Sequence, residues 1–251
     1  MNRLHNASAR SDGAHRMEVR DAMMVVLYDA GGQRRRTIET GSECRMPLEA
    51  LGEERGDEVA ALMGRAFQDD PLFALACPDP GERARWLPWL FRWSTWKGFL
   101  FGQILGSEEP LGGVMALIGP GGGDFTEEDL ARFGYGRGRE VVGAQVWDRA
   151  LAVVNAAFEP IDVALHHAVP APHWYLDVIA VEPARQGRGI GSRLLQAAGA
   201  WADADGMPIV LLTYQPKSLP LYQRHGYVVV CDGTVAGSDV RGWGMRRDPG
   251  T

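Results

Sequence analysis

The pattern of apolar and polar positions is clearest between Trp174 and Ala198. The run from Trp174 to Val181 is rich in strand-forming residues and Pro183 ends it, which predicts a strand. The segment from Ser192 to Ala198 places apolar side chains at helical spacing. A glycine-rich turn, Gln186 to Gly191, separates the two. We therefore predict a strand, a glycine turn and a helix in direct succession.

The chain beyond this helix continues the same alternation. Ile209 to Thr213 is apolar at nearly every position, as expected for a strand inside a sheet, so strand, helix and strand form a βαβ unit. A short helix is predicted from Pro216 to Gly226 and a strand from Tyr227 to Val230. The last predicted strand, Val240 to Arg246, contains glycines and is expected at an edge of the sheet.

The first half of the domain is predicted to contain two amphipathic helices. One ends at Gln68 to Pro71, because the residue before a proline avoids the helical region. Its apolar face comprises Val59, Leu62, Met63, Ala66 and Phe67. The second carries four tryptophans on one face, namely Trp86, Trp89, Trp93 and Trp96. That face either packs in the core or forms an aromatic wall for an apolar ligand.

The middle of the chain is predicted to hold a hairpin and two further helices. Gly98 to Leu105 and Leu111 to Ile118 have the composition of strands. Asp124 to Phe133 and Arg139 to Phe158 are predicted as helices, and Glu159-Pro160 is expected to end the second. The histidines that follow are expected in a loop and have no carboxylate or cysteine at ligand spacing, so no metal site is predicted: His166, His167 and His173.

Composition narrows the class of protein and its partners. The chain has 251 residues, of which 45% are hydrophobic and 23% charged, as in globular proteins. The net charge of -6 argues against a nucleic-acid partner. Three separated cysteines are typical of a reducing cytoplasm, and the apolar run Met23 to Tyr28 is too short to span a membrane. We assign residues 1–44 to an N-terminal extension, with Met23 to Tyr28 as one added strand, and residues 45–251 to the domain.

The glycine turn has the properties of an anion site. The first amides of a helix lack internal partners and the helix dipole favours negative charge there, while glycines let the backbone approach a ligand. The spacing of Gly187, Gly189 and Gly191 is G-x-G-x-G, which fits neither the dinucleotide pattern nor the mononucleotide P-loop. An ordinary tight turn remains the alternative explanation for the glycines.

Two segments resemble the signatures of GCN5-related N-acetyltransferases (GNAT). Arg185 to Gly191 is similar to the pyrophosphate loop of that superfamily, and Leu219 to Tyr227 is similar to its Tyr-x-x-x-Gly-Phe/Tyr segment. The resemblance implies a mixed α/β fold whose sheet is mostly antiparallel, with a parallel pair of strands splayed around an acyl-CoA site. It is strongest to the branch that contains puromycin N-acetyltransferase. That branch carries Glu and Asn where this chain has Leu212 and Ser218.

The resemblance implies roles for residues around the turn. Acetyl-CoA would be the acyl donor, and its pyrophosphate would bind the loop from Arg185 to Ser192, while pantetheine would pair with the strand from Ile179 to Val181 and contact Ser218. The residues implied in donor binding are Ile179, Ala180, Val181, Arg185, Gln186, Gly187, Arg188, Gly189, Ile190, Gly191, Ser192 and Ser218. The acceptor side would be formed by Phe67, Asp70, Trp174 and Tyr214.

Two residues are candidates for acid–base chemistry. Tyr222 lies where the family places its general acid, and a phenol with a pKa of about 10 can protonate a leaving thiolate. Asp177 interrupts an apolar strand run, which marks it as a candidate base or amine anchor unless it pairs with Arg193 or His173. The expected activity is acetyl transfer to a primary amine of a small molecule, by a monomer or homodimer. The alternative is a non-catalytic acyl-CoA-binding or regulatory module of the same fold.

Overall fold

A mixed sheet of nine strands forms the centre of the protein. The computed structural model describes residues 25–28, 34–36, 48–107, 110–169 and 171–251. The strand order is β2-β1-β3-β4-β5-β6-β7-β9-β8. The strands span β1 Val25–Tyr28, β2 Arg34–Arg36, β3 Leu48–Ala50, β4 Gly102–Ser107, β5 Gly113–Ile118, β6 Trp174–Val181, β7 Ile209–Thr213, β8 Val228–Thr234 and β9 Arg241–Arg247.

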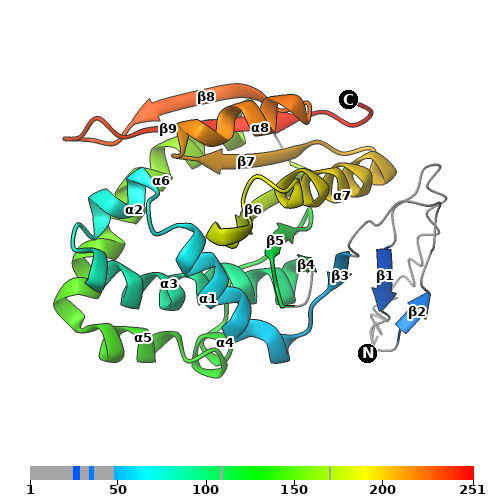
Figure 1. The fold of residues 1–251 in the computed structure, drawn as a ribbon. Coiled ribbons are helices and arrows are strands. Elements are labelled where there is room, and N and C mark those ends of the chain that lie inside the picture. The colour runs from blue at the N-terminus through cyan, green and yellow to red at the C-terminus, as the bar shows by residue number, and fades with distance from the viewer. Residues whose placement is uncertain (1–24, 29–33, 37–47, 108–109, 170) are drawn as a thin grey trace, which may run out of the picture.

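The predicted splayed parallel pair is present at β6 and β7. These strands pair only where Trp174 meets Ile209 and Tyr175 meets Val210, and then they diverge (Figure 1). Neighbouring pairs from β3 to β6 and from β7 to β8 are antiparallel. The predicted fold class, a mixed α/β sheet that is mostly antiparallel, is therefore confirmed.

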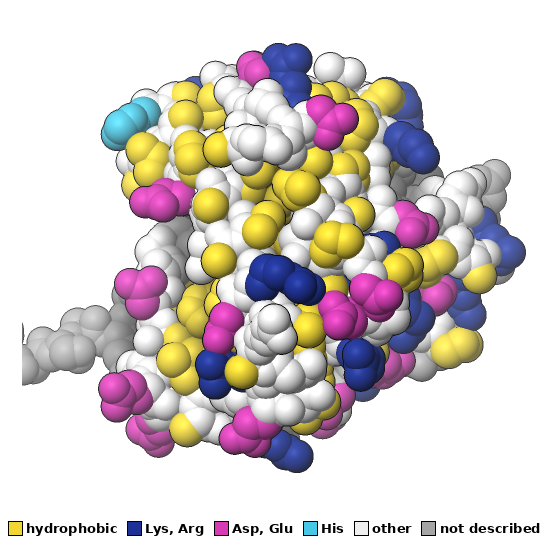
Figure 2. Space-filling view, turned by 90° about the vertical axis from the view of Figure 1, so that its left-hand side faces the viewer, with side chains coloured by type: hydrophobic (Ala, Val, Ile, Leu, Met, Phe, Trp, Pro, Cys, Tyr) yellow, Lys and Arg dark blue, Asp and Glu magenta, His cyan; other side chains and the backbone are white. Residues whose placement is uncertain are grey.

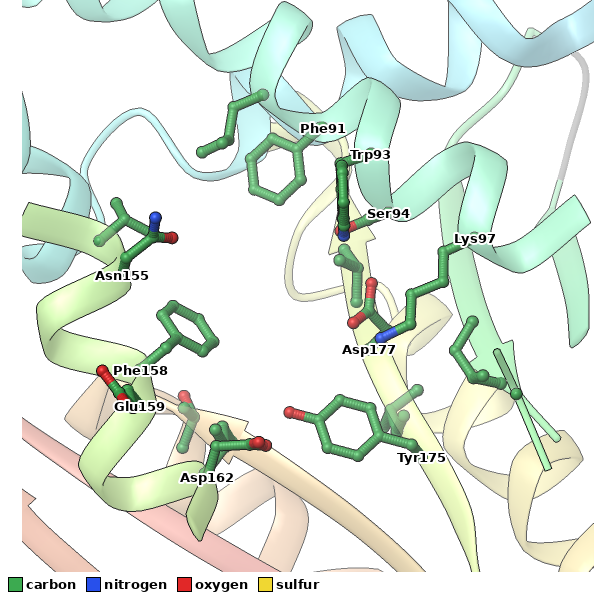
Figure 3. Close-up of a pocket in the computed structure, with 18 of the residues that line it drawn as sticks. Phe91, Trp93, Ser94, Lys97, Asn155, Phe158, Glu159, Asp162, Tyr175 and Asp177 are labelled. Atoms are coloured by element: carbon green, nitrogen blue, oxygen red, sulfur yellow. The ribbon is translucent and has the colours of Figure 1, made fainter. Parts of the chain in front are cut away.

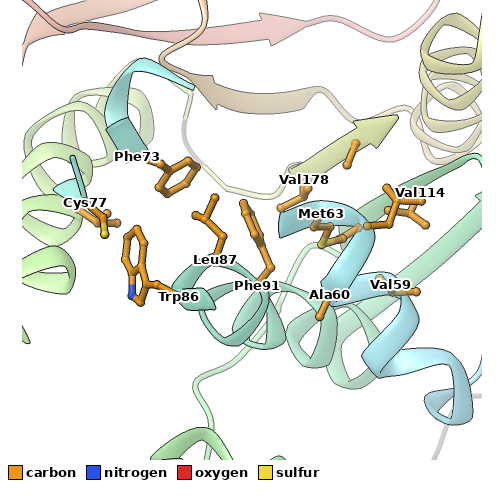
Figure 4. Close-up of a cluster of buried hydrophobic side chains, with 14 of the residues drawn as sticks. Val59, Ala60, Met63, Phe73, Cys77, Trp86, Leu87, Phe91, Val114 and Val178 are labelled. Carbon is orange, nitrogen blue, oxygen red and sulfur yellow. The ribbon is translucent and has the colours of Figure 1, made fainter. Parts of the chain in front are cut away.

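Helices cover both faces of the sheet. Ile104, Val114 and Ala116 point to one side, where they pack with α1 (Gly56–Ala66), α2 (Pro71–Ala76) and α3 (Pro80–Phe101) (Figure 4). The alternate residues Leu105, Met115 and Leu117 point to the other side and pack with α7 (Ile190–Asp205) and α8 (Leu219–Arg224). Burial of each large apolar side chain stabilises the fold by roughly 1.5–3 kcal/mol. The two helical layers thus hold the sheet between them, including β6, which pairs with β5.

Three helices intervene between β5 and β6: α4 (Glu127–Arg132), α5 (Tyr135–Val142) and α6 (Ala144–Ala168). The predicted end at Glu159-Pro160 is wrong, because α6 continues through Pro160. In the turn before this proline, the Ala157 carbonyl accepts a hydrogen bond from Tyr214 Oη at 2.7 Å. The helix also lies close on β9, where a Cβ on Gly242 would come within 2.5 Å of Ile161.

Other boundaries also differ from the predictions. Gly98 is helical and the strand begins only at Gly102, because α3 crosses β4 so closely that a Cβ on Gly98 would lie 2.2 Å from Ile104 Cδ1. The last strand, β9, is not an edge, since the hairpin inserts it between β7 and β8. His166 and His167 belong to the last turn of α6 rather than to a loop. Most of the predicted extension, including Met23, lies outside the described residues.

Candidate active site

A β-bulge determines the direction of the Asp177 side chain. Leu176 pairs with Leu117 and Val178 pairs with Ala116, so Asp177 is an extra residue with no partner on β5. Consequently Leu176 packs on the α7 side and Val178 on the opposite side, although residues two apart in a regular strand share a face. Asp177 Oδ2 is enclosed and accepts no hydrogen bond from the described residues.

Asp177 lines a cavity of about 1,090 Å³ between β6, α3 and α6 (Figure 3). Aromatic side chains form much of its wall, contributed by Phe67, Phe73, Phe91, Trp93, Tyr135, Phe158, Tyr175, Tyr214 and Tyr222. Carboxylates are the commonest charged groups in it, namely Asp70, Asp124, Glu159, Asp162 and Asp177. The surface view shows hydrophobic side chains grouped on one face with acidic ones around its margin (Figure 2). Such a cavity suits a ligand that is both apolar and cationic.

Tyr222 reaches the same cavity from α8, on the far side of the splayed strands. Its side chain is 7% exposed, and its ring contacts that of Tyr227 edge-on at 5.8 Å between centroids. Burial, and secondarily the negative charge of Asp70, raises the pKa of Tyr222 well above its usual value. The phenol therefore stays protonated at neutral pH and is available as a hydrogen-bond and proton donor.

Asp70 both caps a helix and lines the cavity. It caps α2, because its Oδ1 accepts a hydrogen bond from the Leu72 amide at 2.9 Å, and it also lines the cavity. Burial raises the pKa of Asp70 to about 6, although hydrogen bonds from the backbone of Leu72 and Phe73 oppose that shift. Burial, and secondarily the negative charges of Asp162 and Asp70, raises the pKa of Tyr214.

We expect Asp70 to make stability depend on pH. The folded state holds the Asp70 proton more tightly than the unfolded chain, so its ionisation destabilises the fold as pH rises. Relative to Asp70→Asn, the wild-type protein should lose up to about 3 kcal/mol of unfolding free energy between about pH 4 and about pH 7. Urea denaturation of both proteins across this range measures the difference. A difference that does not vary with pH would contradict the raised pKa.

The glycine turn leads directly into α7 and leaves the helix N-terminus open. Gly187 and Gly189 have φ values of 78° and 82°, and a Cβ on either would meet nothing within 4 Å. Residues 186–189 are exposed. Arg185 Nη1 donates to the Pro110 carbonyl at 3.0 Å, and Gln186 Nε2 donates to the Val181 carbonyl at 3.3 Å. These contacts fasten the start of the turn to the connection between β4 and β5 and to the end of β6, while the space beside Gly187 and Gly189 is open.

The cavity brings together both acid–base candidates, three of the four acceptor-side candidates and one of the predicted donor-side residues. The other predicted donor-side residues, Ala180, Val181, Arg185 to Ser192 and Ser218, lie outside its lining. Phe67, Asp70, Asp177, Tyr214 and Tyr222 all line the cavity, as does Ile179. Trp174 is placed elsewhere: its ring stacks on Trp201 at 6.5 Å and its Nε1 donates to Asp205 at 3.0 Å. Ser218, in a short turn before α8, is also outside the lining.

Sequence reasoning missed the contribution of α6 and most of that of α3. Lys97, Asn155, Glu159, Asp162 and Tyr175 line the cavity but were not predicted to do so. A signal was present, because polar residues recur at positions 155, 159, 162 and 166, which form one stripe on a continuous helix. The false helix end at Pro160 divided that stripe. Of the four tryptophans, Trp86 is fully buried in the core and Trp93 lines the cavity.

Comparison with known proteins decides the family. The model of the acetyltransferase (GNAT) family matches residues 70–227, more than half of the chain. The chain belongs to the GNAT family. It is therefore an N-acetyltransferase, as its two predicted signatures indicate, and family membership implies an acyl-CoA donor.

Relatives of this GNAT enzyme are distant in sequence. An uncharacterized N-acetyltransferase of Schizosaccharomyces pombe is 24% identical over 181 residues, which cover 68% of this chain and 70% of that protein. A Corynebacterium glutamicum structure described as histone acetyltransferase HPA2 and related acetyltransferase is 21% identical with a TM-score of 0.56, covering 82% and 97% of the chains. Arylalkylamine N-acetyltransferase 2 of Aedes aegypti is 10% identical with a TM-score of 0.50, covering 81% of this chain and 98% of that chain.

The described residues meet neither the requirements of a metal site nor those of a membrane-spanning helix. The described residues contain no group of three or more histidines, cysteines or carboxylates placed to hold a metal ion. None of the described helices is long and apolar enough to cross a membrane.

Proposed function

We propose that the protein transfers an acetyl group from acetyl-CoA to a primary amine of a small molecule by direct attack. One observation carries the proposal: Tyr222 and Asp177 line the same cavity, Asp177 from β6 and Tyr222 from the side of β7. The Oδ2 atom of Asp177 has no hydrogen-bond partner in the part of the chain that the structure describes. A group that can protonate a thiolate and a group that can hold an amine are then placed around one space. The resemblance to the puromycin N-acetyltransferase branch makes puromycin a reasonable member of the amine panel.

The donor is proposed to lie along β6 and the glycine turn. From Leu176 onward, β6 has one edge that β7 does not occupy, so the amide groups of pantetheine can pair with Ile179 to Val181 as an added strand. The pyrophosphate would lie on the amides of residues 186–192, where the dipole of α7 favours negative charge. Arg188 is exposed beside it and supplies positive charge.

The proposed reaction is a single displacement at the thioester. The amine loses one proton to Asp177 or to water, and its nitrogen attacks the acetyl carbonyl carbon. A C–N bond forms, the C–S bond breaks, and the CoA thiolate takes a proton from Tyr222. The products are an N-acetyl amide and free CoA. A bound ammonium group gives up two protons overall. The proton accepted by Asp177 or by water before attack is released to solvent, and the second, lost from nitrogen as the amide forms, passes to Tyr222 and restores the phenol.

The test is release of free thiol from acetyl-CoA across a panel of primary amines. We expect turnover with wild-type protein, and a loss of kcat/KM for amines of about 100-fold in Asp177→Asn, because the neutral amide neither attracts an ammonium group nor accepts its proton. Asp148→Asn, which makes the same substitution at an aspartate outside the cavity, serves as the matched control. CoA binding without turnover on any amine would support the non-catalytic alternative, which the Leu212 and Ser218 replacements favour.

A further inference from the structure

We propose, on the basis of the proposed function, that the acceptor carries two cationic groups joined by an apolar spacer. Its reacting amine would lie at Asp177, and its second cation would lie at Glu159 and Asp162 across the cavity. A diamine with an aromatic or long aliphatic spacer is the chemical class that these positions recognise. The following observations lead to this class rather than to a simple monoamine.

The first observation is the charge imbalance of the cavity. Five carboxylates line it, against one lysine and the histidines His166 and His173. Lys97 Nζ lies over the ring of Tyr175, 5.6 Å from its centroid. Within the described residues, no lysine or arginine forms an ion pair with Asp177, Glu159 or Asp162; the recorded ion-pair partner of Asp162 is His166. Negative charge in the cavity is therefore left for a ligand to neutralise.

The second observation is that the carboxylates lie at two separate places. Asp177 projects from the bulge in β6, and its enclosed Oδ2 has no hydrogen-bond partner among the described residues. Glu159 and Asp162 project from α6, on the opposite wall (Figure 3). An ammonium group held at Asp177 lies on the wall opposite the α6 carboxylates, so we assign Glu159 and Asp162 to a second cation.

The third observation is the apolar surface between the two places. Phe158 projects from α6 into the cavity, while Phe91 and Trp93 face it from α3 (Figure 3). An apolar spacer would be buried against these rings, and each end would remain with a carboxylate. A ligand that is cationic throughout its length would leave the aromatic side chains without an apolar contact. A ligand with a fully apolar tail would bury the carboxylates of Glu159 and Asp162 without a compensating charge.

The experiment compares two acceptors, benzylamine and p-xylylenediamine, which differ only in a second aminomethyl group. We expect kcat/KM for p-xylylenediamine to exceed that for benzylamine by about tenfold after correction for its two equivalent amines. In Glu159→Gln/Asp162→Asn this ratio should fall close to one.

Asp148→Asn provides the control, because Asp148 belongs to the same helix but pairs with Arg139 outside the cavity. Its diamine-to-monoamine ratio should equal that of wild type. A wild-type ratio of one or less, or an unchanged ratio in the double variant, would overturn the diamine proposal while leaving acetyl transfer to benzylamine intact. Absence of turnover with every amine would instead refute the proposed function, so the two failures are distinguishable.

Discussion

Replacement of Tyr222 by phenylalanine should lower kcat by at least about 100-fold and leave the KM for acetyl-CoA within about twofold. The variant keeps the buried ring that packs against Tyr227 and removes only the hydroxyl. The thiolate must then depart without a proton donor. Because the pKa of Tyr222 is raised, the wild-type rate should show no loss from ionisation of this phenol below about pH 10. Steady-state thiol release across pH measures both effects.

Tyr227→Phe is the matched control for this prediction. Tyr227 is 1% exposed and lies outside the cavity lining, and its buried hydroxyl has no hydrogen-bond partner among the residues that the structure describes. Its replacement should leave kcat unchanged and should not reduce stability, since an unsatisfied polar group is removed. Equal rates in both variants would show that Tyr222 is a packing residue rather than the general acid.

Gly189→Glu should weaken acetyl-CoA binding by at least about 100-fold. The substitution places a carboxylate where the pyrophosphate is proposed to lie, at the N-terminus of α7. It also puts a side chain on a residue with φ of 82°, which costs about 1–2 kcal/mol of stability. Calorimetric titration with acetyl-CoA measures the affinity, and thermal unfolding measures the stability.

Gly206→Glu separates these two effects. Gly206 ends the same helix with φ of 64°, and its Cβ position is equally open. The variant should therefore be destabilised to a similar extent and still bind acetyl-CoA. If both variants lose affinity equally, the weakened binding reflects damage to α7 and not a lost anion site.

The strand, glycine turn and helix that we propose to hold the donor were predictable because their signals are local. Glycines with positive φ, an apolar strand before them and a helix after them are all determined by neighbours in sequence, and the structure has them where the pattern placed them. Tyr222 belongs to the same kind of segment, a short helix ending near Gly226.

The acceptor half depends on contacts between distant segments. The direction of Asp177 follows from the register of β6 against β5, which no pattern within β6 records. The course of α6 through Pro160 accompanies a hydrogen bond from Tyr214, more than fifty residues away. Likewise, the local sequence predicts Gly98 in a strand, whereas the close packing of α3 on Ile104 requires a glycine in the helix at this position. Local propensity was overridden in each case by tertiary packing.

Because α6 packs closely on β9, the residues of β9 that face this helix help to set the width of the cavity. A methyl group at Gly242 would collide with both Ile161 and Tyr214. We therefore expect a larger side chain there to displace α6 toward α3, across the cavity. A substitution at Gly242, which lies outside the cavity lining, should therefore change the selectivity for bulky acceptors without contacting them.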